Sequence, residues 1–253
     1  MSKRTKIRRD TPTETATLRS SDMKGERIVK SFLLRHYYPR RQASGAYTSY
    51  EDIADLDRQI AGEDTIVQLP NGTARIIDEK CALHYINDDL PTFAFEVQYR
   101  NRAGELADGW FLDDALSTQE YDVMWITCRP KAIGGEPLTG KAYAKTLREE
   151  DITEIRLMQL DRQRLLGAVK RACGCTGDLR TFLMPHITAL REEGERMRTK
   201  RWRYVGHVKL LYTPYLKEQP INLVLGRDTI LHRSCTAEWL VKPEGVWPYA
   251  AVR

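Results

Sequence analysis

The sequence contains no long apolar run and no sign of a secretory leader. No stretch approaches the roughly 18 consecutive apolar residues that a membrane-spanning helix needs, and the mean hydropathy is −0.52. The first 22 residues carry charge but lack the apolar centre of a signal peptide. We therefore expect a protein without a membrane partner that works in the cytoplasm.

Cysteine and histidine are also scarce. The five cysteines are odd in number and form no Cys-x-x-Cys pair, which argues against a disulfide scaffold or a cysteine zinc site. The five histidines are scattered and form no His-Glu-x-x-His pattern, which argues against a zinc enzyme. The chain also lacks Gly-x-Gly-x-x-Gly, a phosphate-binding P-loop and Gly-x-Ser-x-Gly. These absences disfavour dehydrogenases, nucleotide-driven motors and serine hydrolases.

Charge is plentiful and unevenly distributed, although the net charge is only +5. Residues 1–45 hold 12 Lys and Arg against 4 Asp and Glu, residues 46–122 hold 5 against 17, and the remainder holds 23 against 14. Charge blocks of this kind are often solvated faces. The pattern also fits a cluster of metal-binding carboxylates flanked by basic segments that attract phosphates. Both interpretations stay open at this point.

The chain predicts a flexible, basic tail over residues 1–22 and one α+β domain over residues 23–253. The domain divides into a core at about 24–127 and an extension of helices and strands at 141–253. Apolar periodicity predicts helices at 25–37, 50–61, 151–172 (after a short strand) and 179–198, and strands at 64–69, 73–80, 92–99, 110–112, 121–126, 209–212 and 221–225. We expect the strands between 64 and 127 to form a mostly antiparallel sheet.

The strongest local signal is Asn71-Gly72 between two β-rich runs, which predicts a tight hairpin. Asp64 opens the first hairpin strand, and Asp78 and Lys80 lie near the end of the second. Because side chains alternate along a strand, Asp78 and Lys80 point to one face and Glu79 to the other. The sequence alone leaves the hairpin register open by one residue.

These residues carry a resemblance to a known family. Gly25-Glu26-Arg-Ile-Val29 on a helix, Gly62-Glu-Asp64-Thr-Ile-Val67 and Ile76-Ile-Asp78-Glu-Lys80 resemble the motif of the PD-(D/E)XK nucleases. The resemblance covers about residues 24–127. It implies a restriction-endonuclease-like core with a mostly antiparallel or mixed sheet flanked by helices. The sequence departs from the family after the lysine strand, where the expected helix is weak because the segment Cys81–Pro91 is short. Small members of this kind resemble proteins of phages and mobile elements, which implies a bacterial or phage-infected cytoplasm.

Phosphodiester hydrolysis needs an activated water and a stabilised phosphorane, and Mg²⁺ (or Mn²⁺) held by carboxylates serves both needs. The resemblance implies that Asp64 and Asp78 bind this metal, that Glu26 binds a second one, and that Lys80 orients the water or stabilises the charge. Each residue also has a structural alternative. Asp64 can cap a strand, Asp78 and Lys80 can form a surface ion pair, and Glu26 can serve the helix dipole.

Near the C-terminal end, the basic segment 196–204 interleaves cations with aromatic side chains. It predicts nucleic-acid contacts through Arg198, Lys200, Arg201 and Arg203, and the alternative is the basic end of a helix. The resemblance therefore implies a metal-dependent endonuclease that acts on DNA, and the sequence leaves RNA open as the substrate. The alternative is a catalytically silent module of the same fold that binds nucleic acid or a protein. A homodimer stays open.

Overall fold

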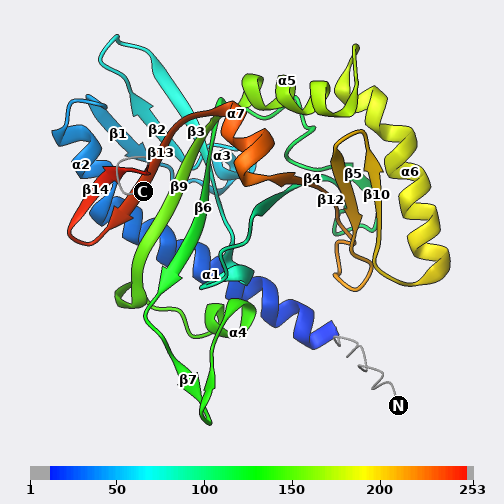
Figure 1. Ribbon diagram of the computed structural model, residues 1–253, viewed down its shortest axis with the longest axis horizontal. Helices are drawn as coiled ribbons and strands as arrows, with labels where there is room; N and C mark the ends of the chain where they lie inside the picture. The colour runs from blue at the N-terminus through cyan, green and yellow to red at the C-terminus, as the bar shows by residue number, and fades with distance from the viewer. Residues whose placement is uncertain (1–11, 250–253) are drawn as a thin grey trace.

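The longest strands carry apolar side chains on both faces, which places them in the middle of a sheet. In β6 (Glu120–Cys128), Val123 and Trp125 point into one apolar cluster, while Met124 and Ile126 point into another. Each cluster is covered by different elements. The computed structural model describes residues 12–249, with side chains from Met23 onward, and Figure 1 shows these elements in space.

The first sheet has seven strands in the order β1-β2-β3-β6-β9-β13-β14. It is mixed, because β3 and β6 run parallel while its other neighbouring strands run antiparallel. Its strands are β1 (Ser49–Asp52), β2 (Thr65–Gln68), β3 (Ala74–Cys81), β6, β9 (Ile152–Asp161), β13 (Cys235–Lys242) and β14 (Gly245–Pro248).

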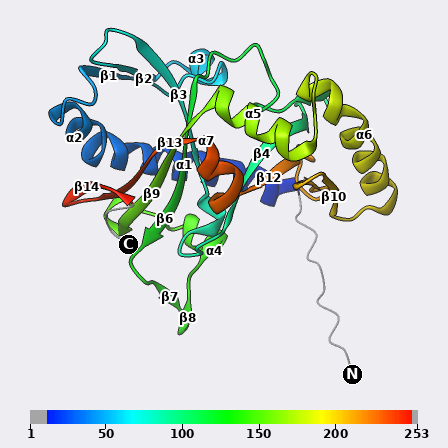
Figure 2. The ribbon, with the colours of Figure 1, turned by 45° about the horizontal axis from the view of Figure 1, so that its top comes forward.

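A second, antiparallel sheet has five strands in the order β10-β11-β12-β4-β5. Its strands are β4 (Thr92–Arg100), β5 (Leu106–Asp108), β10 (Arg201–Val205), β11 (Val208–Tyr212) and β12 (Ile221–Gly226). A small hairpin, β7 (Ala132–Ile133) and β8 (Glu136–Pro137), forms a third sheet and projects from the body (Figures 1 and 2).

The helices cover the two sheets. They are α1 (Pro12–His36), α2 (Tyr38–Ala43), α3 (Leu56–Ile60), α4 (Gly140–Ala144), α5 (Arg162–Cys173), α6 (Leu179–Met197) and α7 (His232–Ser234). Short helical turns lie at η1 (Leu83–Tyr85), η2 (Glu149–Asp151) and η3 (Arg227–Leu231). None of the helices between residues 12 and 249 combines the length and apolar character needed to cross a membrane.

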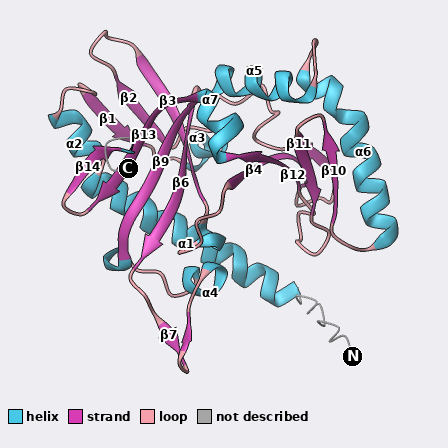
Figure 3. Ribbon diagram, viewed as in Figure 1, coloured by secondary structure: helices cyan, strands magenta, loops and turns pink. Residues whose placement is uncertain are grey.

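The two apolar clusters divide the molecule into layers. One cluster lies between α1 and the first sheet and contains Phe32, Leu33 and Ile77. The other joins the opposite face of that sheet to α5, α6 and the second sheet, and contains Phe95 and Leu183. Figure 3 shows α6 beside the second sheet, far from the first strands of the chain. The predicted α+β class is confirmed.

Several local predictions were wrong. Residues 50–61 do not form one helix, because Asp55 caps a shorter helix by accepting a hydrogen bond from the Arg58 N–H, and Ser49–Asp52 pairs with β2 as a strand. Residues 110–112 form a turn rather than a strand. The predicted helix at 151–172 starts with the ten-residue strand β9.

Predictions about the wider arrangement also need correction. Strand β4 leaves the hairpin and pairs with β12 in the second sheet, so residues 64–127 do not form one antiparallel sheet. After β3 comes only the short turn η1, in the segment where the sequence shows a weak helix. Helix α1 begins at Pro12, before the predicted residue 25, so residues 12–22 are helical. Residues 1–11 of the predicted tail lie outside the described residues.

Candidate active site

The hairpin register brings Asp64 and Asp78 face to face. Thr65 pairs with Ile77 in the β2–β3 ladder, and the Asp64 N–H donates to the Ile77 carbonyl over 2.9 Å. Asp64 therefore stands opposite Asp78, one step beyond the last ladder pair. Its side chain is fixed by the Glu79 N–H, which donates to Asp64 Oδ2 over 2.8 Å. The register that the sequence left open is thus set by the turn at Asn71-Gly72.

A glycine fixes the loop that delivers Asp64. Gly62 has a φ of +79°, a region that favours glycine, and a Cβ there would lie 2.1 Å from Thr118 Oγ1. The Thr118 hydroxyl instead donates to the Gly62 carbonyl over 3.0 Å. This contact ties the loop before β2 to the loop before β6. The Gly62-Glu-Asp64 spacing therefore has a structural cause.

The three side chains in contact are Asp64, Asp78 and Lys80. The Lys80 ammonium donates to Asp78 Oδ1, and Asp78 is only 1% exposed. Its second oxygen, Oδ2, is buried and receives no hydrogen bond from the described residues. Burial, and then the negative charge of Asp78, raises the pKa of Asp64 to about 6. Two carboxyl groups this close cannot both ionise without a cation between them or beside them.

Lys80 is the cation closest to this pair. Burial alone would lower its pKa, but the charges of Asp78, Asp64 and Glu26 outweigh burial and raise the pKa above its usual value. The ammonium also lies 5.1 Å from the centre of the Trp110 ring. About 28% of the Lys80 side chain is exposed, so the site opens to solvent at this residue.

Trp110 belongs to no part of the motif, yet it borders the site and also packs against the core. Its ring packs 5.2 Å from that of Tyr121, which pairs with Asp78 across β3 and β6. The loop that carries Trp110 lies close to the backbone of β4 because Gly109 has no side chain. A Cβ at Gly109 would lie 2.4 Å from the Glu96 backbone. The dipeptide Gly109-Trp110 is the sequence feature that could have indicated this residue, but no local sequence pattern connects it with Lys80.

Glu26 reaches the site from α1. Gly25 is buried against Leu83, where a Cβ would lie 2.9 Å from Leu83 Cδ1. The missing side chain lets α1 pass close to the end of β3. Glu26 then lies near enough to help raise the pKa values of Lys80 and Cys81. It is exposed, so it borders the site rather than filling it.

Glu79 points to the opposite face, as its place in the strand predicts. It accepts hydrogen bonds from Lys30, Tyr38 and Thr65, and Lys30 also pairs with Asp52 at 3.1 Å. This network joins α1 and α2 to the hairpin. Glu79 is therefore a structural residue, and its network holds the strand that carries Asp78 and Lys80.

The carboxylates of Asp64 and Asp78 have the chemistry of ligands for a hard cation, but they are only two. Asp64 and Asp78 offer carboxylate oxygens, and the buried Asp78 Oδ2 has no hydrogen-bond donor. These features suit Mg²⁺ or Mn²⁺. Within residues 12–249, however, no three His, Cys, Asp or Glu side chains form a group that could hold a metal ion. Two protein carboxylates, with phosphate and water completing the shell, are therefore the set that fits.

The basic segment 196–204 runs from the end of α6 into β10 of the second sheet rather than beside these acids. Arg201 and Arg203 turn toward α6, where both approach Glu193 at 3.6 and 3.8 Å. Arg198 and Lys200 are exposed between α6 and β10. Strand β10 is separated from β4 by β11 and β12. Arg201 and Arg203 thus lie on an edge strand of the second sheet, and Arg198 and Lys200 lie in the connection that precedes it.

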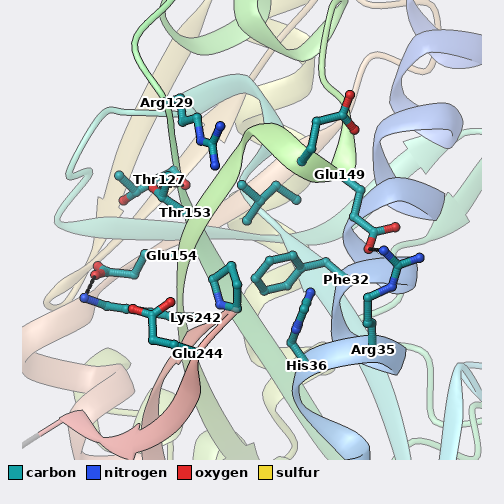
Figure 4. A pocket seen from close by; sticks show the side chains of 13 residues that line it. Phe32, Arg35, His36, Thr127, Arg129, Glu149, Thr153, Glu154, Lys242 and Glu244 are labelled. Atoms are coloured by element: carbon teal, nitrogen blue, oxygen red, sulfur yellow. Dashed lines mark hydrogen bonds and ion pairs between the residues drawn. The ribbon is translucent and has the colours of Figure 1, made fainter.

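A separate cavity of about 810 Å³ lies at the C-terminal end of α1. Figure 4 shows two ion pairs in its lining, Arg35 with Glu149 and Lys242 with Glu154, and the lining carries both signs of charge. Asp64, Asp78 and Lys80 do not line it. The paired charges leave no single sign of charge that would select a polyanion.

A second acid is buried on the Glu79 face of the sheet. Asp122 lies between Glu79 and Gln159 in the strand register. It is fully buried, and neither of its carboxylate oxygens has a hydrogen-bond partner among the described residues. Burial, and then the negative charges of Glu120 and Glu79, raises the pKa of Asp122 well above its usual value.

Asp122→Asn should therefore stabilise the protein at neutral and higher pH. The folded protein keeps the Asp122 proton where the unfolded chain has lost it, so wild-type stability falls as pH rises from about 4 toward the raised pKa. The free energy of unfolding of the wild type falls by at most about 1.4 kcal/mol per pH unit through this group, and the asparagine variant lacks this contribution. Urea denaturation at about pH 5 and about pH 8 measures this, with the exposed Asp57→Asn as control. An unchanged pH dependence in Asp122→Asn would contradict it.

Comparison of the chain with protein-family models, with curated proteins and with solved structures gave no match.

Proposed function

We propose that the protein is a metal-dependent endonuclease that hydrolyses phosphodiester bonds in DNA. The observation that carries the proposal is the pair of facing carboxyl groups, Asp64 and Asp78, with the Lys80 ammonium bound to one of them. The element order also supports it, because α1 with Glu26, the β2–β3 hairpin and Asp78-Glu-Lys80 follow the order of the PD-(D/E)XK resemblance.

Each residue has a role that follows from its position. Asp64 and Asp78 would hold Mg²⁺ or Mn²⁺, which when bound would acidify water and offset phosphate charge. Lys80 supplies a fixed positive charge beside the carboxylates, where it can stabilise the negative phosphate oxygens. Trp110 covers one side of Lys80 and limits its exposure to water. Glu26, at the rim, can orient a water or help to hold a second cation.

The test is cleavage of two substrates, a supercoiled plasmid and a single-stranded oligonucleotide, each with Mg²⁺, Mn²⁺ or a chelator. We expect cuts only with metal, and conversion of the plasmid to nicked or linear forms would identify an endonuclease. If the wild-type protein cuts neither substrate with either metal, the proposal is wrong.

The second candidate is a catalytically silent module of the same fold that binds nucleic acid or a protein. Two observations favour it. The described residues form no three-ligand metal group, and Lys80 already neutralises Asp78. DNA binding that weakens with salt, without cleavage, would support this candidate over the nuclease.

A further inference from the structure

The second sheet exposes two large aromatic side chains on one face. Trp202 is 57% exposed and Tyr204 is 59% exposed. Both lie on β10, an edge strand of the sheet, and their rings are 5.5 Å apart at an angle of 75°. Exposed aromatic side chains beside each other on a strand are costly in water unless a partner covers them.

Strand alternation separates these aromatic residues from their basic neighbours. Arg201 and Arg203 turn toward Glu193 on α6, so Trp202 and Tyr204 point to the other face of the sheet. There Tyr204 pairs with Lys209 of β11, whose ammonium lies 5.1 Å from the centre of the Trp202 ring. We name Trp202, Tyr204 and Lys209 the aromatic platform.

The charge around the aromatic platform points to an anionic partner. Lys209 is the cation that lies beside the two rings on this face. Residues 198–217 contain six Lys and Arg and no Asp or Glu, but two of these cations, Arg201 and Arg203, lie on the opposite face beside Glu193. The first eleven residues of the chain hold five Lys and Arg against one Asp, so like charge disfavours them as the partner. A second copy of the same platform is disfavoured for the same reason.

We infer that the aromatic platform binds single-stranded nucleic acid by stacking unpaired bases on Trp202 and Tyr204 while Lys209 contacts a phosphate. Flat rings next to a cation match a base joined to its phosphate, and paired bases in a duplex cannot offer their faces. The inference that the platform binds single-stranded nucleic acid depends only on this surface. That such binding selects single-stranded or frayed DNA for cleavage rests on the proposed nuclease function.

The experiment measures fluorescence anisotropy of a labelled oligo(dT) in EDTA, which removes cleavage from the reading. The Trp202→Ala, Tyr204→Ala double variant should bind oligo(dT) about tenfold more weakly or worse, because each stacked base is lost. Trp247→Ala is the matched control, since Trp247 is 38% exposed on the other sheet and should leave binding unchanged.

Two further arms test the details. Lys209→Met keeps the side-chain stem over Trp202 but removes the charge, so the salt slope of binding should fall by about 0.7. A fully paired hairpin should depend on Trp202 and Tyr204 much less than oligo(dT) does. Equal binding of oligo(dT) by the double variant and the wild type overturns the inference. So does a wild-type protein that fails to bind oligo(dT) but binds a protein partner through the aromatic platform.

The outcomes separate this inference from the proposed function. If the protein binds oligo(dT) through Trp202 but cleaves no substrate, the inferred role of the platform is supported and the proposed nuclease function is wrong. Metal-dependent cleavage, together with oligo(dT) binding that the Trp202→Ala, Tyr204→Ala double substitution does not change, supports the nuclease function and contradicts the inferred role of the platform.

Discussion

Asp78→Asn should abolish metal-dependent cleavage, with a loss of about a thousandfold or more. The change keeps the shape of a side chain that is 1% exposed, but it removes one of the two carboxylates available to a cation. Losing metal-derived stabilisation of several kcal/mol corresponds to a loss of this size. DNA binding should stay intact or become tighter, because one negative charge that repels phosphate is gone.

The control is Glu79→Gln on the opposite face of the same strand. It should cleave almost normally, although the lost ion pair with Lys30 should lower its melting temperature, so the assay must run below that temperature. Plasmid nicking with Mg²⁺ and Mn²⁺ measures both variants. An inactive Glu79→Gln beside an active Asp78→Asn would contradict the assignment of the two faces.

Lys80→Ala should lower cleavage by about a hundredfold or more, because a positive charge beside the phosphate is lost. Its metal binding should persist or strengthen, since the ammonium now occupies Asp78 Oδ1 and repels cations. This split between binding and cleavage separates a role in chemistry from a role as metal ligand. Single-turnover cleavage and Mn²⁺ titration of the same preparation measure the two effects.

The chain offers a matched control in Lys131→Ala. Lys131 also pairs with an aspartate, Asp151, and its side chain is 28% exposed, the same as that of Lys80. It also lies 5.1 Å from an aromatic ring, that of Tyr143. Lys131→Ala should therefore lose a similar ion pair and cleave like the wild type. Equal losses in the two variants would mean that Lys80 acts only through stability.

The sequence predicted the local part of the candidate site well. The Asn71-Gly72 turn placed both hairpin strands to within a residue or two, and alternation placed Asp78 and Lys80 on one face. Turn chemistry and alternation are short-range effects, so a single sequence displays them. The motif spacing also indicated Asp64, whose loop depends on Gly62.

The remaining errors have physical causes. Strand β9 is buried on both faces, and its apolar residues are spaced irregularly between Glu154, Arg156 and Gln159, so they show no alternation that distinguishes the strand from a helix. Strand β1 is short, exposed and polar, so it looks like the start of a helix. The departure of β4 to the second sheet and the contact of Trp110 with Lys80 depend on distant partners, which no local pattern reports.

Direct titration of Mn²⁺ into the wild-type protein and Asp78→Asn tests most directly whether Asp64 and Asp78 form a divalent-cation site. Calorimetry at about pH 7.5 keeps Asp64 mostly ionised, given its raised pKa of about 6. We expect a wild-type site that Asp78→Asn weakens by about tenfold or more, while Lys80→Ala retains it. Equal Mn²⁺ affinity in the wild type and Asp78→Asn would contradict the metal site and the nuclease function proposed from it.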